Sequence, residues 1–353
     1  MDHKKLIQNL IGAIVKENGS DIHLSKDKHP MIRVHGDLHY LEAMPVLTSE
    51  DIIEIISLIL TPDYKEKFLK EKEIDFSFES SDVRFRGSCF FAQKSIGVSL
   101  RLIPKKVKSL EELNLPPILE IFTQKKQGFF LVVGPMGHGK STTLASMIEM
   151  INQTRAEHIV TIEDPVEYIF QKGKSMIDQR EIKIDTKDFP TALNSVFRQD
   201  ADVLMIGEMR GLETISTSVT AAETGHLVFS TLHTNNAAQT VDRIIDVFPP
   251  QQQNQIKIQL AASLLGIFSQ RLIPRISGGM IPAYELLINN NATANLIREG
   301  RTFEISNVIE TSSNEGMVSL NKSLEDLVRM GEVTLEDAKK YSYRSRELSK
   351  NLR

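Results

Sequence analysis

The start of the chain carries apolar side chains first at helical spacing and then in alternation with polar ones. Residues 5–17 place their apolar side chains on one face of a predicted helix: Leu6, Ile7, Leu10, Ile11, Ile14 and Val15. Polar and apolar residues alternate over residues 21–24 and 31–35, and Gly36-Asp37 marks a turn between strands. This change of period predicts a helix followed by antiparallel strands.

A second helix is predicted after Thr48, because residues 48–51 supply capping groups ahead of a run of isoleucines. Three later segments have the composition of strands: residues 74–78, 83–86 and 97–103. Together these elements predict a small α+β domain over residues 1–104.

The pattern changes again beyond a basic and polar stretch, and we interpret residues 105–117, which end at Pro116-Pro117, as an interdomain linker. Continuous apolar runs then alternate with helical segments. The runs lie at residues 129–133, 158–162, 203–206 and 226–231. Strands that are apolar throughout and separated by helices indicate a mostly parallel sheet covered on both faces. Residues 118–353 are therefore predicted to form an α/β domain with helices at its C-terminal end.

Composition agrees with two globular domains, since 353 residues correspond to about two domains of roughly 150 residues. The net charge of −4 argues against a dedicated nucleic-acid binder, which usually carries a basic excess. The single cysteine, Cys89, excludes an internal disulfide and a zinc site built on four cysteines, and it fits a reducing cytosol.

The sequence has no apolar run near the roughly 20 residues that span a bilayer, and its start lacks the features of a signal peptide. We expect the protein to stay in the cytoplasm and to reach a membrane only through a partner.

The clearest chemical motif follows the first apolar strand of the second domain. Its eight residues satisfy the P-loop pattern of Gly, four residues, Gly, Lys and Ser or Thr: Gly134, Pro135, Met136, Gly137, His138, Gly139, Lys140 and Ser141. The glycines allow backbone amides to converge on phosphate oxygens, and the following helix adds its dipole. We expect Lys140 to hold the β and γ phosphates, Ser141 to ligate Mg²⁺ and Thr142 to contact the α phosphate. His138 is a further candidate contact.

Two acidic residues follow apolar strands at the edge where parallel sheets bind ligands. Glu163 follows the strand at 158–162, and Glu208 follows the strand at 203–206 in the form of a Walker B element. Hydrolysis of a phosphoanhydride needs one group that supports Mg²⁺ and another that orients the attacking water. Glu208 suits the first role and Glu163 the second.

These motifs resemble those of the hexameric secretion ATPases, and within them the PilT-type retraction ATPases of type IV pili. The resemblance covers nearly the whole chain and rests on the P-loop, on Thr161-Ile162-Glu163-Asp164-Pro165, on Gly207-Glu208-Met209-Arg210 and on residues 221–234. It implies a PAS-like domain followed by a RecA-like P-loop NTPase domain. It also implies that Glu163 is the catalytic glutamate and that His226 and His233 sense nucleotide. Read without the family, two histidines seven residues apart make a poor metal site.

The resemblance extends to the first domain and to the end of the chain. Arg84 and Arg86 lie two apart on a predicted strand and share a face, and with Arg101 they match arginines that reach nucleotide in this family. Residues 294–300 resemble a helix motif of the retraction ATPases.

The family implies ATP and Mg²⁺ as cofactors and a homohexameric ring at the cytoplasmic face of the inner membrane. The implied partners are the membrane platform of the pilus machine and an accessory retraction ATPase paralogue, with no nucleic acid among them. Three alternatives stay open at this point. A pilus assembly or type II secretion ATPase generally carries a tetracysteine zinc element. A nucleic-acid translocase would be stimulated by nucleic acid, and a regulatory subunit would show little turnover.

Overall fold

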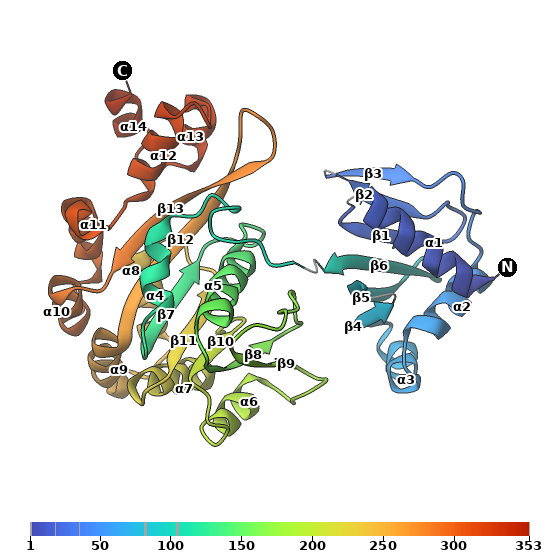
Figure 1. Ribbon diagram of the computed structural model, residues 1–353, viewed down its shortest axis with the longest axis horizontal. Helices are drawn as coiled ribbons and strands as arrows, with labels where there is room; N and C mark the ends of the chain where they lie inside the picture. The colour runs from blue at the N-terminus through green and yellow to red at the C-terminus, as the bar shows by residue number, and fades with distance from the viewer. Residues whose placement is uncertain (1, 18, 35, 81–82, 104–105, 353) are drawn as a thin grey trace. The chain divides into compact units, whose positions relative to one another are not determined.

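The computed structural model describes residues 2–17, 19–34, 36–80, 83–103 and 106–352. The chain divides into two compact units (Figure 1). Met1–Lys105 and Glu167–Ile169 form the first, and Lys106–Val166 with Phe170–Arg353 form the second. Eight residues within the predicted domains and linker lie outside the described residues: Met1, Asn18, His35, Ser81, Asp82, Pro104, Lys105 and Arg353.

The first unit is a mixed α+β structure. Its elements are, in order, α1 (His3–Lys16), β1 (Asp21–Leu24), β2 (Met31–Val34), β3 (Asp37–Tyr40), α2 (Ser49–Ile59), α3 (Pro62–Glu71), β4 (Glu73–Ser80), β5 (Val83–Ala92) and β6 (Ser95–Ile103). The described strands form one six-stranded sheet in the order β3-β2-β1-β6-β5-β4, and all of its neighbours are antiparallel. The predicted antiparallel α+β architecture is confirmed.

The helices of the first unit begin where the sequence supplies caps. The Asp2 carboxylate accepts from the Lys5 amide at the start of α1. Thr48 and Asp51 form a complete capping box at the start of α2, as their spacing predicts. Apolar faces of α1 and α2 then meet the sheet in a single buried cluster that also contains Cys89. Burial raises the pKa of the Cys89 thiol to about 12, so this side chain behaves as a small apolar group.

The second unit has an α/β fold. Its elements are, in order, η1 (Pro117–Leu119), α4 (Glu120–Thr123), β7 (Gly128–Val133), α5 (Lys140–Thr154), β8 (His158–Glu163), β9 (Met176–Glu181), α6 (Phe189–Val196), β10 (Val203–Ile206), α7 (Leu212–Glu223), β11 (Leu227–Leu232), α8 (Ala237–Asp246), α9 (Pro250–Ser263), β12 (Leu264–Pro274), β13 (Met280–Ile288), α10 (Asn291–Glu299), η2 (Thr302–Glu304), α11 (Ile305–Thr311), η3 (Ser313–Glu315), α12 (Leu320–Arg329), α13 (Leu335–Tyr341) and α14 (Ser345–Asn351).

The described strands of this unit form a seven-stranded sheet in the order β13-β12-β7-β11-β10-β8-β9. Every neighbouring pair is parallel except β12 and β13, which form an antiparallel hairpin. The mostly parallel sheet predicted from the apolar runs is therefore confirmed. The runs predicted β7, β8, β10 and β11 to within about a residue.

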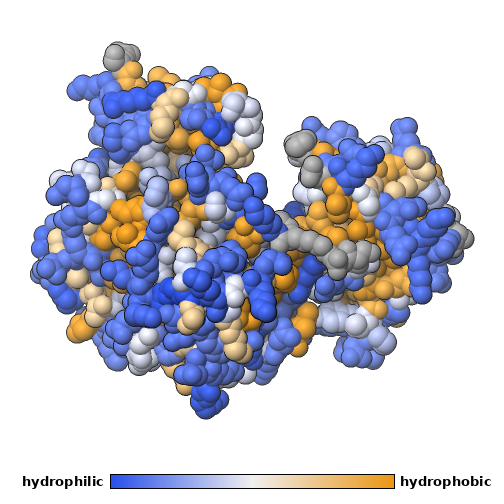
Figure 2. Space-filling model, viewed as in Figure 1, coloured by the Kyte–Doolittle hydropathy of each residue, from blue (hydrophilic) through white to orange (hydrophobic). Residues whose placement is uncertain are grey.

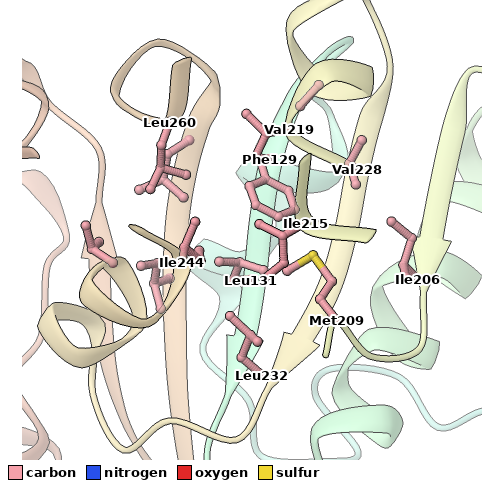
Figure 3. Packing of buried hydrophobic residues seen from close by; sticks show 14 of the residues in the cluster. Phe129, Leu131, Ile206, Met209, Ile215, Val219, Val228, Leu232, Ile244 and Leu260 are labelled. Carbon is pink, nitrogen blue, oxygen red and sulfur yellow. The ribbon is translucent and has the colours of Figure 1, made fainter. Parts of the chain in front are cut away.

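Both faces of the parallel sheet are buried. On β7, Phe129, Leu131 and Val133 belong to one core, whereas Phe130 and Val132 belong to the core on the opposite face. Figure 3 shows Phe129 and Leu131 beside Ile215 and Val219 of α7. Hydrophilic residues predominate on the visible surface of the unit (Figure 2). A strand covered on both sides has to be apolar throughout, which explains the continuous runs.

Two further parts of the chain complete the second unit. Residues 106–117, most of the predicted linker, belong to it rather than standing apart, because Leu110 and Leu115 are buried in the same core as α5. Helices α12, α13 and α14 pack in a separate cluster against Ile273 and Ile281 of the β12–β13 hairpin. None of the described helices is both long enough and apolar enough to cross a membrane.

A histidine at the start of β8 gives the second unit a pH-dependent contact. The His158 ring donates from Nε2 to Asp178 (3.0 Å) and from Nδ1 to the Asp200 carbonyl (3.1 Å), which only the charged ring can do at once. Burial lowers the pKa of His158, but these two hydrogen bonds outweigh it and raise the pKa above its ordinary value. The charged ring is therefore stabilised by folding.

We expect His158→Gln to destabilise the protein below pH 6.5 and to have little effect at pH 8 and above. A raised pKa in the folded state stabilises fully below the unfolded pKa, and this stabilisation is lost as the pH rises through the folded value. Because Asp178 is half exposed, the effect should be about 0.3–1 kcal/mol. Thermal unfolding of both proteins at pH 5.8 and pH 8 measures it, and an equal difference at the two pH values would contradict the assignment.

Candidate functional site

The residues singled out by the motifs line one edge of the parallel sheet. The P-loop follows β7, His233 follows β11, Glu208 lies two residues beyond β10, and Glu163 ends β8. These strands are neighbours in the order β7, β11, β10, β8, and all are parallel. Their carboxyl ends meet at one edge, where open α/β sheets bind ligands. The fold therefore brings the loop, the histidine and the two acids together.

Lys140 is the first residue of α5 and is buried. Its ammonium donates to the carbonyls of Gly134 and Pro135 at 2.9 Å each, and it lies 3.3 Å from Nδ1 of His233. These contacts hold the ammonium against the P-loop and beside His233. A desolvated ammonium beside the N-terminus of a helix is suited to bind phosphate oxygens.

The P-loop rests against β12, which the sequence did not predict as part of the site. Gln270 accepts from the Thr143 hydroxyl (2.6 Å) and donates to the His138 carbonyl (2.9 Å). A Cβ added at Gly134 would lie 2.4 Å from the Gln270 carbonyl oxygen, so the two backbones touch at this point. Polar residues inside an apolar stretch, Ser269-Gln270-Arg271, were the signal that could have identified this strand.

This close approach predicts that Gly134→Ala is far more damaging than Gly137→Ala. Gly134 has φ +144° and no room for a side chain, whereas Gly137 has φ +78° with nothing within 4 Å of its Cβ position. The first change combines a clash with backbone strain and should cost about 2–4 kcal/mol. The second adds strain alone, about 1–2 kcal/mol. Thermal unfolding compares them, and equal midpoints would show that the contact with Gln270 is unimportant.

The remaining P-loop positions differ in their exposure. Met136 is 84% exposed, whereas Ser141 and Thr142 on the first turn of α5 are half-buried. The Leu272 amide donates to Nδ1 of His138 at 2.8 Å, and burial followed by the charges of Arg271 and Lys140 lowers the pKa of this histidine. His138 is thus a neutral ring tied to β12, with only Nε2 left to meet a ligand.

Glu163 is a buried carboxylate, 5% exposed. Its Oε1 accepts from the Thr161 hydroxyl at 2.6 Å and from the Gln179 amide at 3.3 Å. Gly207, at the end of β10, lies against the Glu163 backbone, which places the two acidic strand ends side by side. A fixed carboxylate at the same sheet edge as the P-loop can accept a proton from water or orient it.

Glu208 and Lys140 are connected through His233. Oε2 of Glu208 lies 3.5 Å from Nε2 of His233, while the other ring nitrogen faces Lys140. A proton on Nε2 satisfies both contacts, because Nδ1 then accepts from the ammonium and Nε2 donates to the carboxylate. Oε1 of Glu208 pairs with Arg210 at 2.6 Å. His233 therefore touches both the P-loop lysine and the Walker B glutamate.

His226 does not share this position. It precedes β11, whose first residue pairs with Gly128 and whose last pairs with Val133, so His226 and the P-loop lie at opposite ends of the strand. The rise of a strand separates the two histidines by roughly 20 Å. His226 instead contacts the Ala221 carbonyl (3.1 Å) and the ring of Phe197. The expectation that both histidines belong to one nucleotide site is not met within the chain.

The three candidate arginines lie on neighbouring strands of the first unit. Arg86 on β5 and Arg101 on β6 are paired directly across the sheet, and Arg84 shares the face of Arg86. Arg101 donates from Nε to the buried Asp21 carboxylate at 2.8 Å. Burial raises the pKa of Asp21, but the hydrogen bonds from Ser20 and Arg101 outweigh it and lower the pKa overall. The structure thus brings the arginines together on one surface of their unit.

A cavity of about 230 Å³ adjoins the P-loop at Gly139, Thr142 and Thr143. Its remaining walls combine apolar and polar side chains from residues 108–115 and from β12 and β13, among them Leu113, Leu115, Leu272, Met280, Glu112 and Asn114. The cavity has the P-loop on one side and a wall of mixed apolar and polar side chains on the other. This arrangement suits a flat ring joined to a phosphate chain.

This chain is similar over most of its length to several known proteins. A family model described as Type II/IV secretion system protein matches residues 2–340. The chain is 41% identical over 334 residues to the type IV pilus retraction ATPase PilT of Pseudomonas aeruginosa, covering 94% of this chain and 97% of the relative. It is 43% identical over 322 residues to a twitching motility protein of Neisseria gonorrhoeae, covering 91% and 86%.

The fold comparison agrees. A crystal structure of the pilus retraction motor PilT with bound ADP aligns with a TM-score of 0.91 and 43% identity, over 97% of this chain and 98% of that one. The resemblance in the motifs is therefore matched over the full length of both units. The chain belongs to the type II/IV secretion system protein family and has the fold of its PilT-like ATPases.

Proposed function

We propose that this protein hydrolyses ATP and uses the energy to retract type IV pili. The observation that carries the proposal is the row formed by the P-loop, His233, Glu208 and Glu163 along one sheet edge. Two relatives that each match more than nine tenths of the chain support it, since one is named as a retraction ATPase and the other as a twitching motility protein.

The nucleotide is held by groups with different chemistry. Lys140 exchanges its two P-loop carbonyls for phosphate oxygens, and the amides at the start of α5 bind the same anion. The cavity beside Gly139 and Thr142 receives the nucleoside part, with Leu115, Leu272 and Met280 against the base. This division leaves the γ phosphate at the sheet edge, near His233 and the two acids.

The donors at this edge fit Mg²⁺. Ser141 offers a hydroxyl and Glu208 a carboxylate, both hard oxygen donors, and a magnesium ion usually takes its other ligands from phosphates and water. No group of three or more His, Cys, Asp or Glu side chains is placed to hold a metal by itself in the described part of the chain. The ion would neutralise charge on the phosphates, while Glu163 accepts the proton of the attacking water.

His233 reports on the nucleotide through its neighbours. It contacts Lys140 on one side and Glu208 on the other, so any movement of either group on phosphate binding displaces the ring. Arg84, Arg86 and Arg101 of the first unit are proposed to stabilise the γ phosphate in the working assembly, and His226 contributes to sensing there. We propose a homohexameric ring in the cytoplasm, in which nucleotide-driven motions of the two units are reset by hydrolysis and product release.

The proposed partners follow from the role. The ring acts on the inner-membrane platform of the pilus machine, with an accessory retraction ATPase paralogue and without nucleic acid. A pilus assembly or type II secretion ATPase is the nearest alternative. Its usual zinc element needs four cysteines, and this chain has one.

Two experiments test the proposal at its two levels. Steady-state phosphate release by the full chain with ATP and Mg²⁺ tests the chemistry, and absence of turnover above a blank would overturn it. Deletion of the gene tests the biological role. Loss of retraction predicts hyperpiliated, non-motile cells, whereas bald cells would assign the protein to pilus assembly instead.

A further inference from the structure

The loop that follows His233 is anchored by an unusual number of hydrogen bonds. The backbone carbonyl of Asn235 accepts from the Tyr343 hydroxyl (2.6 Å), from the Ser269 hydroxyl (2.8 Å) and from Nη2 of Arg271 (3.3 Å). The side-chain oxygen of Asn235 accepts from the same Nη2 at 3.0 Å. A residue two positions from His233 is thus held by donors on two distant parts of the chain.

Arg271 is the centre of this arrangement. Its side chain is buried, 7% exposed, and Nη2 also donates to the Tyr343 oxygen at 2.8 Å. Its Nη1 is buried without a hydrogen-bond partner among the described residues. A buried guanidinium that already leaves one nitrogen unsatisfied depends strongly on the contacts it keeps. Asn235 and Tyr343 supply those contacts in the described structure.

Tyr343 brings the end of the chain to this loop. It lies between α13 and α14, and its hydroxyl is shared by Arg271 and Asn235 in a closed triangle of hydrogen bonds. Burial raises the pKa of the Tyr343 hydroxyl, and Arg271 only partly offsets this, so the proton is available for donation to the Asn235 carbonyl. The tyrosine ring is half exposed, so its hydroxyl rather than its packing is the specific contribution.

We propose that Tyr343 and Arg271 are positioning residues for ATP hydrolysis that act through Asn235 to hold His233 against Lys140 and Glu208. This inference rests on the proposed function. The loop between β11 and α8 is short, so displacement of Asn235 moves His233 with it. The cavity proposed for the base and ribose lies beside Gly139 and Thr142, and neither Tyr343 nor Arg271 lines it. The network therefore governs turnover more than nucleotide affinity.

Tyr343→Phe tests this in the full chain, because it removes one hydroxyl and keeps the ring. We expect kcat to fall about five- to tenfold, the effect of losing one ordinary hydrogen bond, with the KM for ATP changed less than about twofold. Tyr341→Phe is the matched control. Tyr341 lies in the same segment at the end of α13, and its hydroxyl makes no hydrogen bond to a described residue.

Hydrogen exchange measured on the same proteins gives a readout that is independent of activity. We expect Tyr343→Phe to speed exchange at the amides of residues 233–237 and to leave the P-loop amides unchanged. A purely structural role for the tyrosine would instead speed exchange over residues 335–352 alone.

The outcomes separate this inference from the function on which it rests. Turnover by the wild-type protein with an unchanged kcat in Tyr343→Phe would overturn the positioning role and leave the ATPase intact. Equal loss of kcat in Tyr341→Phe, or faster exchange confined to residues 335–352, would overturn it as well. Absence of turnover in the wild-type protein would instead overturn the proposed function.

Discussion

Replacing Lys140 with alanine is expected to abolish ATP hydrolysis, with a decrease of about 10²- to 10³-fold or more. The ammonium is the only side-chain cation that the described structure places directly over the P-loop carbonyls. Its removal takes away the charge that the β and γ phosphates need in both the ground state and the transition state. Phosphate release under saturating ATP measures the effect.

A matched lysine in the same unit controls for loss of charge. Lys126 is 82% exposed and pairs with Glu157 at 2.8 Å, away from the sheet edge. Lys126→Ala should keep turnover within about twofold of the wild-type value, because Glu157 keeps its ion pair with Arg155 at 2.9 Å when the exposed lysine is removed. Turnover by Lys140→Ala at the level of Lys126→Ala would remove the P-loop from the proposed site.

Glu163→Gln is expected to bind nucleotide normally and to hydrolyse it about 10²- to 10⁴-fold more slowly. The amide keeps an oxygen that accepts from Thr161 and Gln179, so the side chain should stay in place. What is lost is the carboxylate that accepts a proton from water. The split between retained binding and lost turnover distinguishes this variant from Lys140→Ala.

Binding of a fluorescent ADP analogue and single-turnover phosphate release measure the two effects separately. Glu213→Gln is the control, since Glu213 is exposed on the first turn of α7 and changes only surface charge. If Glu163→Gln turned over as fast as this control, another group would have to activate the water, and Glu208 would be the next candidate.

The strands that the sequence predicted most closely are those whose apolar residues are almost all buried in the core. β7, β8, β10 and β11 are buried on both faces and are mostly apolar, with Thr161, Ser230 and Thr231 as small buried polar residues within them. β3 follows the predicted turn at Gly36-Asp37, but its bounds were not predicted because all four of its residues are exposed. α3 was not predicted because Phe68 is its only buried residue. In both cases local sequence carries little information, since tertiary pairing determines the structure.

The residues expected to contact nucleotide could be predicted because they belong to sequence motifs. The residues that hold those motifs in place could not be predicted in this way. The P-loop, Glu163 and Glu208 follow strands, and the sheet brings them together at one edge as expected. Gln270, Arg271 and Asn235 have no motif, because their role depends on which strand lies beside β7. The two histidines show the converse. The family resemblance placed both in one nucleotide-sensing motif, but the strand between them is six residues long and sends them to opposite ends.

The face of β12 on which each side chain lies depends on the number of residues that follow its bulge. An extra residue, Leu265, bulges between the pairs that Leu264 and Gly266 make with β7. Beyond the bulge, Gln270 faces the P-loop and Arg271 faces the loop of Asn235. Because successive side chains of a strand point to opposite faces, inserting or deleting one residue between positions 266 and 270 would exchange these two partners. Homologues should therefore vary in length at the β12–β13 turn, around Gly278 and Gly279, and hold the distance from the bulge to Gln270 constant.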